Sequence, residues 1–247
     1  NENILKMGEV IGKRHINKYI KDPELRKKLT PTYRLGCKRV LLSNNYYQAL
    51  AQPNLEVVTD GIEKFTKDSV VTKDGTSRKI DAVILGTGFH VADSFQYYDV
   101  MGKDGITFQK AFENGPEAYY GTCVHHFPNM FMMLGPNTGL GHNSMIYMIE
   151  SQTNYIIDAV SKMQQQHIRS IEVKKDVQDK FNAEIQRKLE GTVWQSGCKS
   201  WYVSEDGKNH TVWPGFTLEF RNRTKTINLK DYTLEKVVSK RKEPELV

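Results

Sequence analysis

Two glycine-containing turns are the stretches of this sequence best suited to chemistry. In the first, an apolar run over residues 82–85 leads into Gly86, Thr87 and Gly88 within "KIDAVILGTGFHV". A strand followed by glycines can cradle a pyrophosphate when a helix follows at once, because the N–H groups at the helix start meet the anion. Here Val91 takes the sixth position of that fingerprint, and no helical stripe follows. We therefore predict that the glycines end a strand where the backbone passes close to another group, with a plain turn as the alternative.

The second turn, "GPNTGLGHNS" over residues 135–144, gives the stronger signal of a helix start. Asn143 and Ser144 are both good N-caps, and a helix that begins near Met145 presents unpaired N–H groups and the positive end of its dipole. This arrangement suits a partly anionic group, such as the pyrimidine edge of a reduced flavin. His142 is a candidate acid or base, although a lone histidine in a glycine loop more often forms a pocket wall. A tight capped turn without a ligand is the alternative.

Cysteine and histidine residues give a weaker signal. Cys123, His125 and His126 lie close together in the sequence, but adjacent histidines on a strand face opposite sides and no further ligand is clustered with them. We therefore predict no metal site. The three cysteines, Cys37, Cys123 and Cys198, are far apart, so neither a disulfide framework nor a cysteine zinc site is expected. A reducing, cytoplasmic location fits this pattern best.

The composition indicates a soluble α/β protein. The chain has 247 residues, of which 38% are hydrophobic, and a formal net charge of +6. No apolar run approaches the roughly 18 to 20 residues that span a bilayer, and the first residues do not form a signal peptide. The basic residues are spread out and not interleaved with aromatic ones, which argues against nucleic acid as a partner. The chain does not begin with Met, so we expect a fragment.

Hydrophobic periodicity and turn residues predict the elements of the first part of the chain. A short helix is expected over residues 22–29, with Asp22 as its N-cap and a proline at its first position. A hairpin is expected through the turn at residues 73–76, and its second strand should run on to the glycines. Strands are predicted over residues 39–43, 55–59, 69–72 and 82–85. Residues 92–117 are expected to be irregular.

The second part of the chain is predicted to be mainly helical. A buried strand over residues 129–134 should lead into the second glycine turn. Apolar residues then recur at helical spacing over residues 145–165 and again over residues 177–189, where the helix is expected to stop at Gly191. Short aromatic-rich loops and hairpins are predicted after residue 193.

Four motifs, taken in order, resemble those of one family, the class B flavin-dependent monooxygenases, and within it the Baeyer–Villiger monooxygenases. They are "GCKRVLLSNNYYQAL" (residues 36–50), "DAVILGTGF" (81–89), "FPNMFMMLGPNTGLGHNSM" (127–145) and "SWYV" (200–203). Members of that family are longer and begin with a GxGxxG motif for FAD, followed by a family fingerprint and a second GxGxxG for NADPH. These three motifs are absent here, so the chain resembles the carboxy-terminal half of such an enzyme and is not expected to hold FAD by itself.

The resemblance implies a fold and an activity. The fold would be α/β, a partial flavoprotein with two Rossmann-like dinucleotide-binding domains, in which residues 1–88 end the NADPH domain and residues 89–247 end the FAD domain with a helical and loop extension. The activity would be that of a monooxygenase that uses FAD, NADPH and a C4a-peroxyflavin to insert one oxygen atom from O2 into a ketone or onto a heteroatom. The missing amino-terminal half would be the required partner.

The resemblance assigns three residues to the NADP side of the site. Arg39 would supply the fixed positive charge beside the flavin and contact the nicotinamide, because a guanidinium stays protonated and its planar fork can meet both. Lys38 matches the residue that contacts the 2′-phosphate of NADPH. Trp201 matches the tryptophan that closes over NADP and substrate. A surface arginine, a solvated lysine and a buried structural tryptophan are the alternatives.

The resemblance also assigns residues to the flavin and the substrate. The flavin would be approached by Thr87, Gly88, Asn143, Ser144 and the backbone of Met145. The substrate pocket would be lined by Leu140, Gly141 and His142. Three other functions stay open: an N- or S-oxygenating flavin monooxygenase, an oxidase that releases peroxide, and a non-catalytic interaction module that lacks the FAD half.

Overall fold

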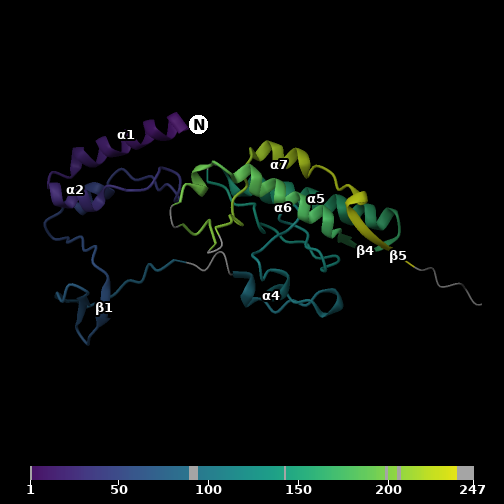
Figure 1. The fold of residues 1–247 in the computed structure, drawn as a ribbon, viewed down its shortest axis with the longest axis horizontal. Helices are drawn as coiled ribbons and strands as arrows, with labels where there is room; N and C mark the ends of the chain where they lie inside the picture. The colour runs from purple at the N-terminus through teal and green to yellow at the C-terminus, as the bar shows by residue number, and fades with distance from the viewer. Residues whose placement is uncertain (1, 89–93, 142, 198–199, 205–206, 238–247) are drawn as a thin grey trace, which may run out of the picture. The chain divides into compact units, whose positions relative to one another are not determined.

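The chain folds into two compact units, each described here by itself. The computed structural model describes residues 2–88, 94–141, 143–197, 200–204 and 207–237 (Figure 1). Unit 1 consists of Asn1–Gly36 and Val40–Phe89, and unit 2 of Cys37–Arg39 and His90–Val247. Whether residues 1–88 and 89–247 correspond to NADPH and FAD domains stays a prediction.

Unit 1 begins with three helices: α1 (Glu2–Tyr19), α2 (Pro23–Leu29) and α3 (Tyr46–Leu50). The start of α2 is capped as predicted, because the Asp22 side chain accepts a hydrogen bond from the backbone N–H of Glu24 at 2.9 Å. Thr30 is the C-cap of the same helix. The short predicted helix is therefore confirmed.

The rest of unit 1 is a small antiparallel sheet in the order β1-β2-β3. Its strands are β1 (Ile62–Phe65), β2 (Ser69–Thr72) and β3 (Ser77–Lys79). The predicted hairpin is confirmed: β2 and β3 are paired in register, and Gly75 supplies the left-handed conformation of the turn at φ 83°. The second strand of the hairpin ends at Lys79, however, well before the glycines where it was expected to end.

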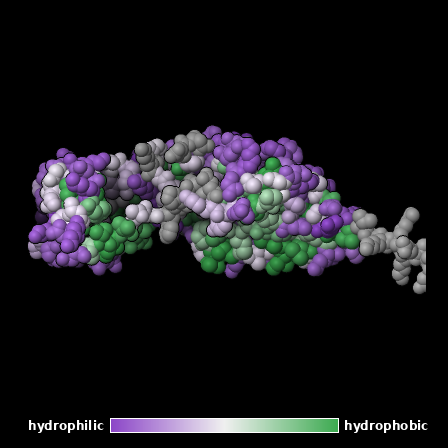
Figure 2. Space-filling model, turned by 90° about the horizontal axis from the view of Figure 1, so that it is seen from below, coloured by the Kyte–Doolittle hydropathy of each residue, from purple (hydrophilic) through white to green (hydrophobic). Residues whose placement is uncertain are grey.

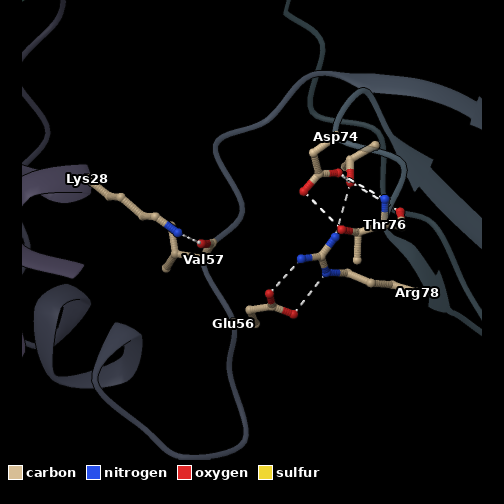
Figure 3. Close-up of polar contacts among 7 residues, drawn as sticks. Lys28, Glu56, Val57, Asp74, Thr76 and Arg78 are labelled. Carbon is tan, nitrogen blue, oxygen red and sulfur yellow. Dashed lines mark hydrogen bonds and ion pairs between the residues drawn. The ribbon is translucent and has the colours of Figure 1, made fainter. Parts of the chain in front are cut away.

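Polar contacts hold the hairpin of unit 1 to the chain before β1 (Figure 3). Arg78 forms two hydrogen bonds with the carboxylate of Glu56, at 3.0 Å from Nε and 2.8 Å from Nη2. In the turn, the carboxylate of Asp74 accepts hydrogen bonds from the Thr72 hydroxyl at 2.6 Å and from the Thr76 backbone N–H at 3.0 Å. These polar contacts connect the hairpin to the preceding chain and order its turn.

The four apolar runs predicted as strands at residues 39–43, 55–59, 82–85 and 129–134 are not strands in this structure. Leu42 and Ile84 have 94% and 96% of their surface exposed. A continuous apolar run forms a strand when neighbouring strands pair with its backbone and other layers cover both faces. The described residues supply no such neighbours, so these predictions are wrong for this chain.

Unit 2 is built around a helical layer and a two-stranded antiparallel sheet (Figure 1). Its elements are α4 (Phe108–Ala111), α5 (Met145–Gln165), β4 (Ile168–Val173), α6 (Lys175–Leu189), α7 (Thr217–Arg223) and β5 (Tyr232–Lys236). The helix predicted over residues 145–165 is confirmed as α5, and α6 ends before Gly191 as expected. The sequence did not predict β4, β5 or α7. The described part of residues 92–117 holds only α4 and two short 3-10 helices.

The apolar core of unit 2 lies between these elements. β4 pairs with β5 through Ile171 and Leu234, and α5 packs against both β4 and α7. The largest fully buried side chains of this core include Trp213, Tyr155, Phe220, Ile185 and Leu189. A second, smaller cluster gathers Phe108, Phe112, Ala118, Val124 and Phe127.

Apolar side chains also reach the surface, and Figure 2 shows them gathered in several patches on one face of the molecule. Among the described residues, no helix is both long enough and apolar enough to cross a membrane.

Candidate functional site

Arg39 lies against the loop that was predicted to line the substrate pocket. Its Nη1 atom donates a hydrogen bond to the backbone carbonyl oxygen of Leu140 at 3.1 Å, across 101 positions of sequence. Leu140 is buried. The fold thus joins the predicted catalytic arginine to a predicted pocket residue, a contact that spacing along the chain could not indicate.

The segment before Arg39 is anchored at Cys37. This residue is fully buried and disulfide-bonded, and its Sγ atom accepts a hydrogen bond from the Ser196 hydroxyl at 3.5 Å. The sequence predicted no disulfide framework, and its cysteine spacing gave no signal for this single bond, since a fold can join cysteines that are remote in sequence. Cys123 is a buried free cysteine. Lys38, between Cys37 and Arg39, is exposed.

Tyr202, one of two stacked aromatic residues, lies next to Arg39. The rings of Trp201 and Tyr202 are stacked, with centroids 4.8 Å apart and planes inclined by 27°. Trp201 keeps 47% of its surface exposed, whereas Tyr202 is buried. Burial raises the pKa of the Tyr202 phenol, and the charge of Arg39 together with a hydrogen bond between the two side chains opposes that rise. Tyr202 therefore connects Trp201 to Arg39. In the sequence, nothing indicated this role except that Tyr202 is adjacent to Trp201.

The loop that carries Leu140 is fixed from behind by residues 209–213. Gly139 donates a backbone hydrogen bond to Thr211 at 2.7 Å and accepts one from Trp213 at 2.9 Å. The buried amide of Asn137 donates to the backbone oxygens of Asn209 and Val212 at 2.8 and 3.1 Å. Residues 209–213 could not be recognised from the sequence as part of the site, because main-chain bonding of this kind leaves no signature in side-chain types.

Gly141 follows Leu140 and faces Trp194. A Cβ atom at Gly141 would lie 3.6 Å from Cζ2 of Trp194, which is ordinary contact distance. Trp194 therefore forms a wall beside this loop and also packs against the main core. His142 lies outside the described residues, so its place in the pocket stays a prediction.

The turn into α5 is capped twice. Asn143 donates from Nδ2 to the Thr217 hydroxyl at 2.9 Å and accepts from the backbone N–H of Ser144 at 2.7 Å. The Ser144 hydroxyl accepts from the backbone N–H of Ile146 at 3.3 Å, which makes Ser144 the N-cap. Met145 packs partly against the core. The backbone N–H of Ile146, in the first turn of α5, is therefore already paired with the cap. Contact of this turn with a flavin stays a prediction.

Thr87 and Gly88 belong to unit 1 and are exposed. Gly88 has φ 86°, and a Cβ atom there would meet nothing within 4 Å among the described residues. No α-helix follows these glycines in the described part of residues 89–107. The segment therefore lacks the helix start that a phosphate-binding loop requires, and its approach to a flavin stays a prediction.

The side chains of this chain are better suited to bind NADP than to bind the pyrophosphate of FAD. Lys38, Arg39 and the indole N–H of Trp201 offer two cations and an aromatic donor, which is the chemistry that a phosphorylated nicotinamide dinucleotide requires. The glycine turn at residues 135–144 leads into α5, but it has Ser144 at the sixth position of the GxGxxG spacing that binds the pyrophosphate of FAD.

Comparison with known proteins gives a consistent result. No protein-family model matches the chain. It is 48% identical to a Baeyer–Villiger monooxygenase of Pseudomonas aeruginosa over 233 residues, covering 94% of this chain and 44% of that protein. It is 44% identical to a Baeyer–Villiger monooxygenase of Streptomyces coelicolor over 232 residues, covering 93% of this chain and 45% of that protein.

Solved structures match as well. Cyclohexanone monooxygenase from Rhodococcus sp. Phi1, bound to NADP+, superposes with a TM-score of 0.85 at 25% identity, covering 96% of this chain and 46% of that chain. The complex of OTEMO with FAD and NADP has the same fold, with a TM-score of 0.85 at 24% identity. The chain is homologous to the Baeyer–Villiger monooxygenases, flavoproteins with an α/β FAD- and NADP-binding fold, and it spans about half the length of the relatives that it matches.

Proposed function

We propose that this chain forms part of an FAD- and NADPH-dependent monooxygenase that inserts one oxygen atom from O2 into a ketone. The observation that carries the proposal is the hydrogen bond of Arg39 to Leu140, which places an exposed permanent cation against a buried residue of the predicted pocket loop. A guanidinium in such a place can stabilise negative charge that develops on oxygen. The similarity to Baeyer–Villiger monooxygenases supports the same activity.

In this proposal, different residues of the chain bind different parts of NADPH. Arg39 holds the nicotinamide end and provides the positive charge, while exposed Lys38 binds the 2′-phosphate as a compact cation. Trp201 closes over the ligand and donates its indole N–H, supported by its stacking on Tyr202. Leu140, Gly141 and His142 line the substrate pocket in this proposal.

Bound FAD would supply the oxygen-activating chemistry. In this chain, Thr87, Gly88 and the turn at Asn143, Ser144 and Met145 would approach it. The remaining contacts would come from polypeptide equivalent to the amino-terminal half of the relatives. The exposed apolar runs at residues 40–42 and 82–85 support the need for such additional polypeptide. No described backbone hydrogen bond involves them. Apolar runs of this kind form strands when neighbouring strands pair with them and other layers cover both faces.

A direct test uses the longer protein that contains this sequence, assayed with NADPH, O2 and a panel of cyclic ketones. Arg39→Ala should abolish lactone or ester formation, with loss of more than about a hundredfold if a preorganised charge is removed. Arg39→Lys should recover only a small part, since it keeps the charge without the planar fork. Arg169→Ala, at an exposed arginine on β4, is the matched control and should leave product yield unchanged. Unchanged lactone yield in Arg39→Ala would contradict the role of Arg39.

Product analysis also separates the alternatives. Sulfoxide or N-oxide as the sole product indicates a heteroatom oxygenase, and hydrogen peroxide as the sole product indicates an oxidase. Absence of flavin absorbance in the purified longer protein would favour a non-catalytic module.

The proposal includes a cytoplasmic location, where NADPH is available to the enzyme. The disulfide at Cys37 is unusual for a reducing compartment. Cell fractionation checks the location, and thiol labelling with and without reductant checks whether Cys37 is oxidised there.

A further inference from the structure

Three potential metal ligands come together in unit 2. His125, His126 and Glu172 each offer one ligand atom, and these atoms all lie within 4.8 Å of one another. Glu172 belongs to β4, and 45 positions of sequence separate it from the histidine pair. The third ligand is therefore supplied by the fold and could not be recognised from the spacing of the histidines.

The backbone turns both histidines toward the same place. His126 has φ 71°, a left-handed conformation that non-glycine residues adopt only when their surroundings hold them in it. As a result the two imidazole rings lie with centroids 4.1 Å apart. In the extended conformation assumed from the sequence, the rings would have faced opposite sides. The premise on which a metal site was dismissed is therefore wrong.

Both imidazoles have a nitrogen suited to a metal. Nδ1 of His126 is buried and has no hydrogen-bond partner among the described residues, which is costly for a polar atom. Nδ1 of His125 lies 3.0 Å from the backbone oxygen of Val173. The same nitrogen lies 3.2 Å from Oε1 of Glu172, so it is the ring atom of His125 that faces the other ligands, and a metal ion bound there would replace its contact with the Val173 oxygen.

The carboxylate is held in position as well. Oε1 of Glu172 accepts a hydrogen bond from the backbone N–H of His126 at 3.0 Å and lies 3.2 Å from Nδ1 of His125. Glu172 is buried. The loop is fixed to β4 by Asn129, whose side-chain oxygen accepts from the backbone N–H of Ile171 at 3.0 Å. A site whose ligands are positioned by such supporting bonds needs little reorganisation to bind.

Lys103 is the competing cation at this place. Its Nζ atom lies 3.7 Å from Oε2 of Glu172, and its side chain is more than half exposed. An exposed lysine can swing into solvent at little cost, because an ion pair of this kind contributes little. Lys103 thus balances the charge of Glu172 without blocking a stronger ligand.

We propose that His125, His126 and Glu172 bind a divalent transition-metal ion of the zinc type, with solvent completing its coordination. Two imidazole nitrogens and one carboxylate oxygen form a known ligand set for Zn²⁺, and imidazole favours such ions over Mg²⁺ or Ca²⁺. Small side-chain rotations close the present separations to bonding distance. The ion ties the loop that carries the histidines to β4, which makes its role structural.

The test titrates the longer protein that contains this sequence with Zn²⁺ by calorimetry and with Co²⁺ by visible spectroscopy, in a buffer that does not bind metals. One equivalent should bind, and the Tm should rise with the concentration of free metal. Glu172→Gln should lower the affinity at least about tenfold while still accepting the hydrogen bond from His126. His126→Asn should do the same, and asparagine tolerates the left-handed backbone. His167→Asn is the matched control, since His167 is exposed and also has positive φ.

A second variant keeps the test decisive if the ligand variants fold poorly. Lys103→Met should raise Zn²⁺ affinity by about threefold or more, because it removes the cation that competes for Glu172. Stoichiometric binding that is unchanged in Glu172→Gln, or lost equally in His167→Asn, would place the metal elsewhere. Absence of binding to the folded wild-type chain would also overturn the proposal. None of these measurements depends on oxygenase activity.

Discussion

Units 1 and 2 have similar apolar runs but bury them to very different extents. In unit 2, Trp213 and Phe220 are completely buried in a core shared by helices and a sheet. In unit 1, Leu42 and Ile84 are almost fully exposed, and the described buried residues are Ile16, Ile20, Ser69 and Thr72. The difference shows that an apolar run stabilises a fold only where another surface of the same chain is available to cover it.

The two units also use charge differently. In unit 2, Arg223 forms two 2.9 Å hydrogen bonds with Glu184 while its guanidinium lies 5.5 Å from the ring centroids of both Tyr120 and Phe181. In unit 1, Arg78 and Glu56 form a similar two-bond pair in a solvent-exposed setting (Figure 3). The first pair is part of a packed structure, whereas the second joins loops at the surface.

The largest difference between the units should appear when apolar side chains are truncated. Phe220→Ala is expected to lower the free energy of unfolding by about 3–5 kcal/mol, because it leaves a cavity in the core of unit 2. Ile84→Ala should change it by less than about 0.5 kcal/mol, because exposed apolar residues lose little on truncation. Urea denaturation followed by far-ultraviolet circular dichroism, to which the helices and strands of both units contribute, measures both changes. Equal effects would show that unit 1 buries Ile84 in solution.

A smaller effect is expected from the packed ion pair. Arg223 is the main cause that lowers the pKa of the Glu184 carboxyl to about 2. Since the folded pKa is depressed, the stabilisation is present above the ordinary value near 4.5 and is lost as the pH falls toward 2. Arg223→Met should cost about 1–2 kcal/mol at neutral pH and shift acid unfolding of unit 2 to higher pH.

The control for that variant is Arg169→Met, at an exposed pair with Glu235 whose closest atoms are 3.7 Å apart. This change should have almost no effect. Circular dichroism followed between pH 7 and 2 compares the two variants. An acid transition that is the same in both variants would show that the pair of Arg223 and Glu184 does not contribute to acid stability.

The smallest effect is expected in the exposed turn of unit 1. The Thr72 hydroxyl, followed by the amide and hydroxyl of Thr76, lowers the pKa of Asp74 to about 2. Thr72→Val should raise that pKa toward its ordinary value, as measured by NMR titration of the carboxyl carbon. The lowered pKa stabilises the turn above pH 3.8, and this stabilisation is lost as the pH falls through about 2. Because the turn is exposed to solvent, the free energy of unfolding of the whole chain should hardly change. An unaltered titration would show that the hydroxyl does not bind Asp74 in solution.

Prediction from the sequence succeeded where the determinants are local. The bounds of α5 followed from apolar spacing and the cap at Ser144, and the hairpin of unit 1 followed from the turn around Gly75. It failed at residues 82–85, because a strand requires a neighbour that the described chain does not provide. It also missed β4 and β5, whose paired residues lie 59 to 68 positions apart in the sequence.

The candidate site shows the same division. Resemblance pointed to Arg39, Leu140 and Trp201, while Tyr202 and Trp194 became visible only in the structure. Tyr202 matters through its contact with Arg39, and Trp194 through its position beside Gly141. Neither relation can be read from residue types.

The sequence by itself determined the caps, turns and amphipathic helices, and its four motifs determined the homology to Baeyer–Villiger monooxygenases. Only the tertiary structure decided the hydrogen bond of Arg39 to Leu140, the disulfide at Cys37 and the grouping of the two histidines with Glu172. The reason is physical. Caps and periodicity act over a few residues along the backbone, whereas these contacts depend on which remote segments the buried core brings together.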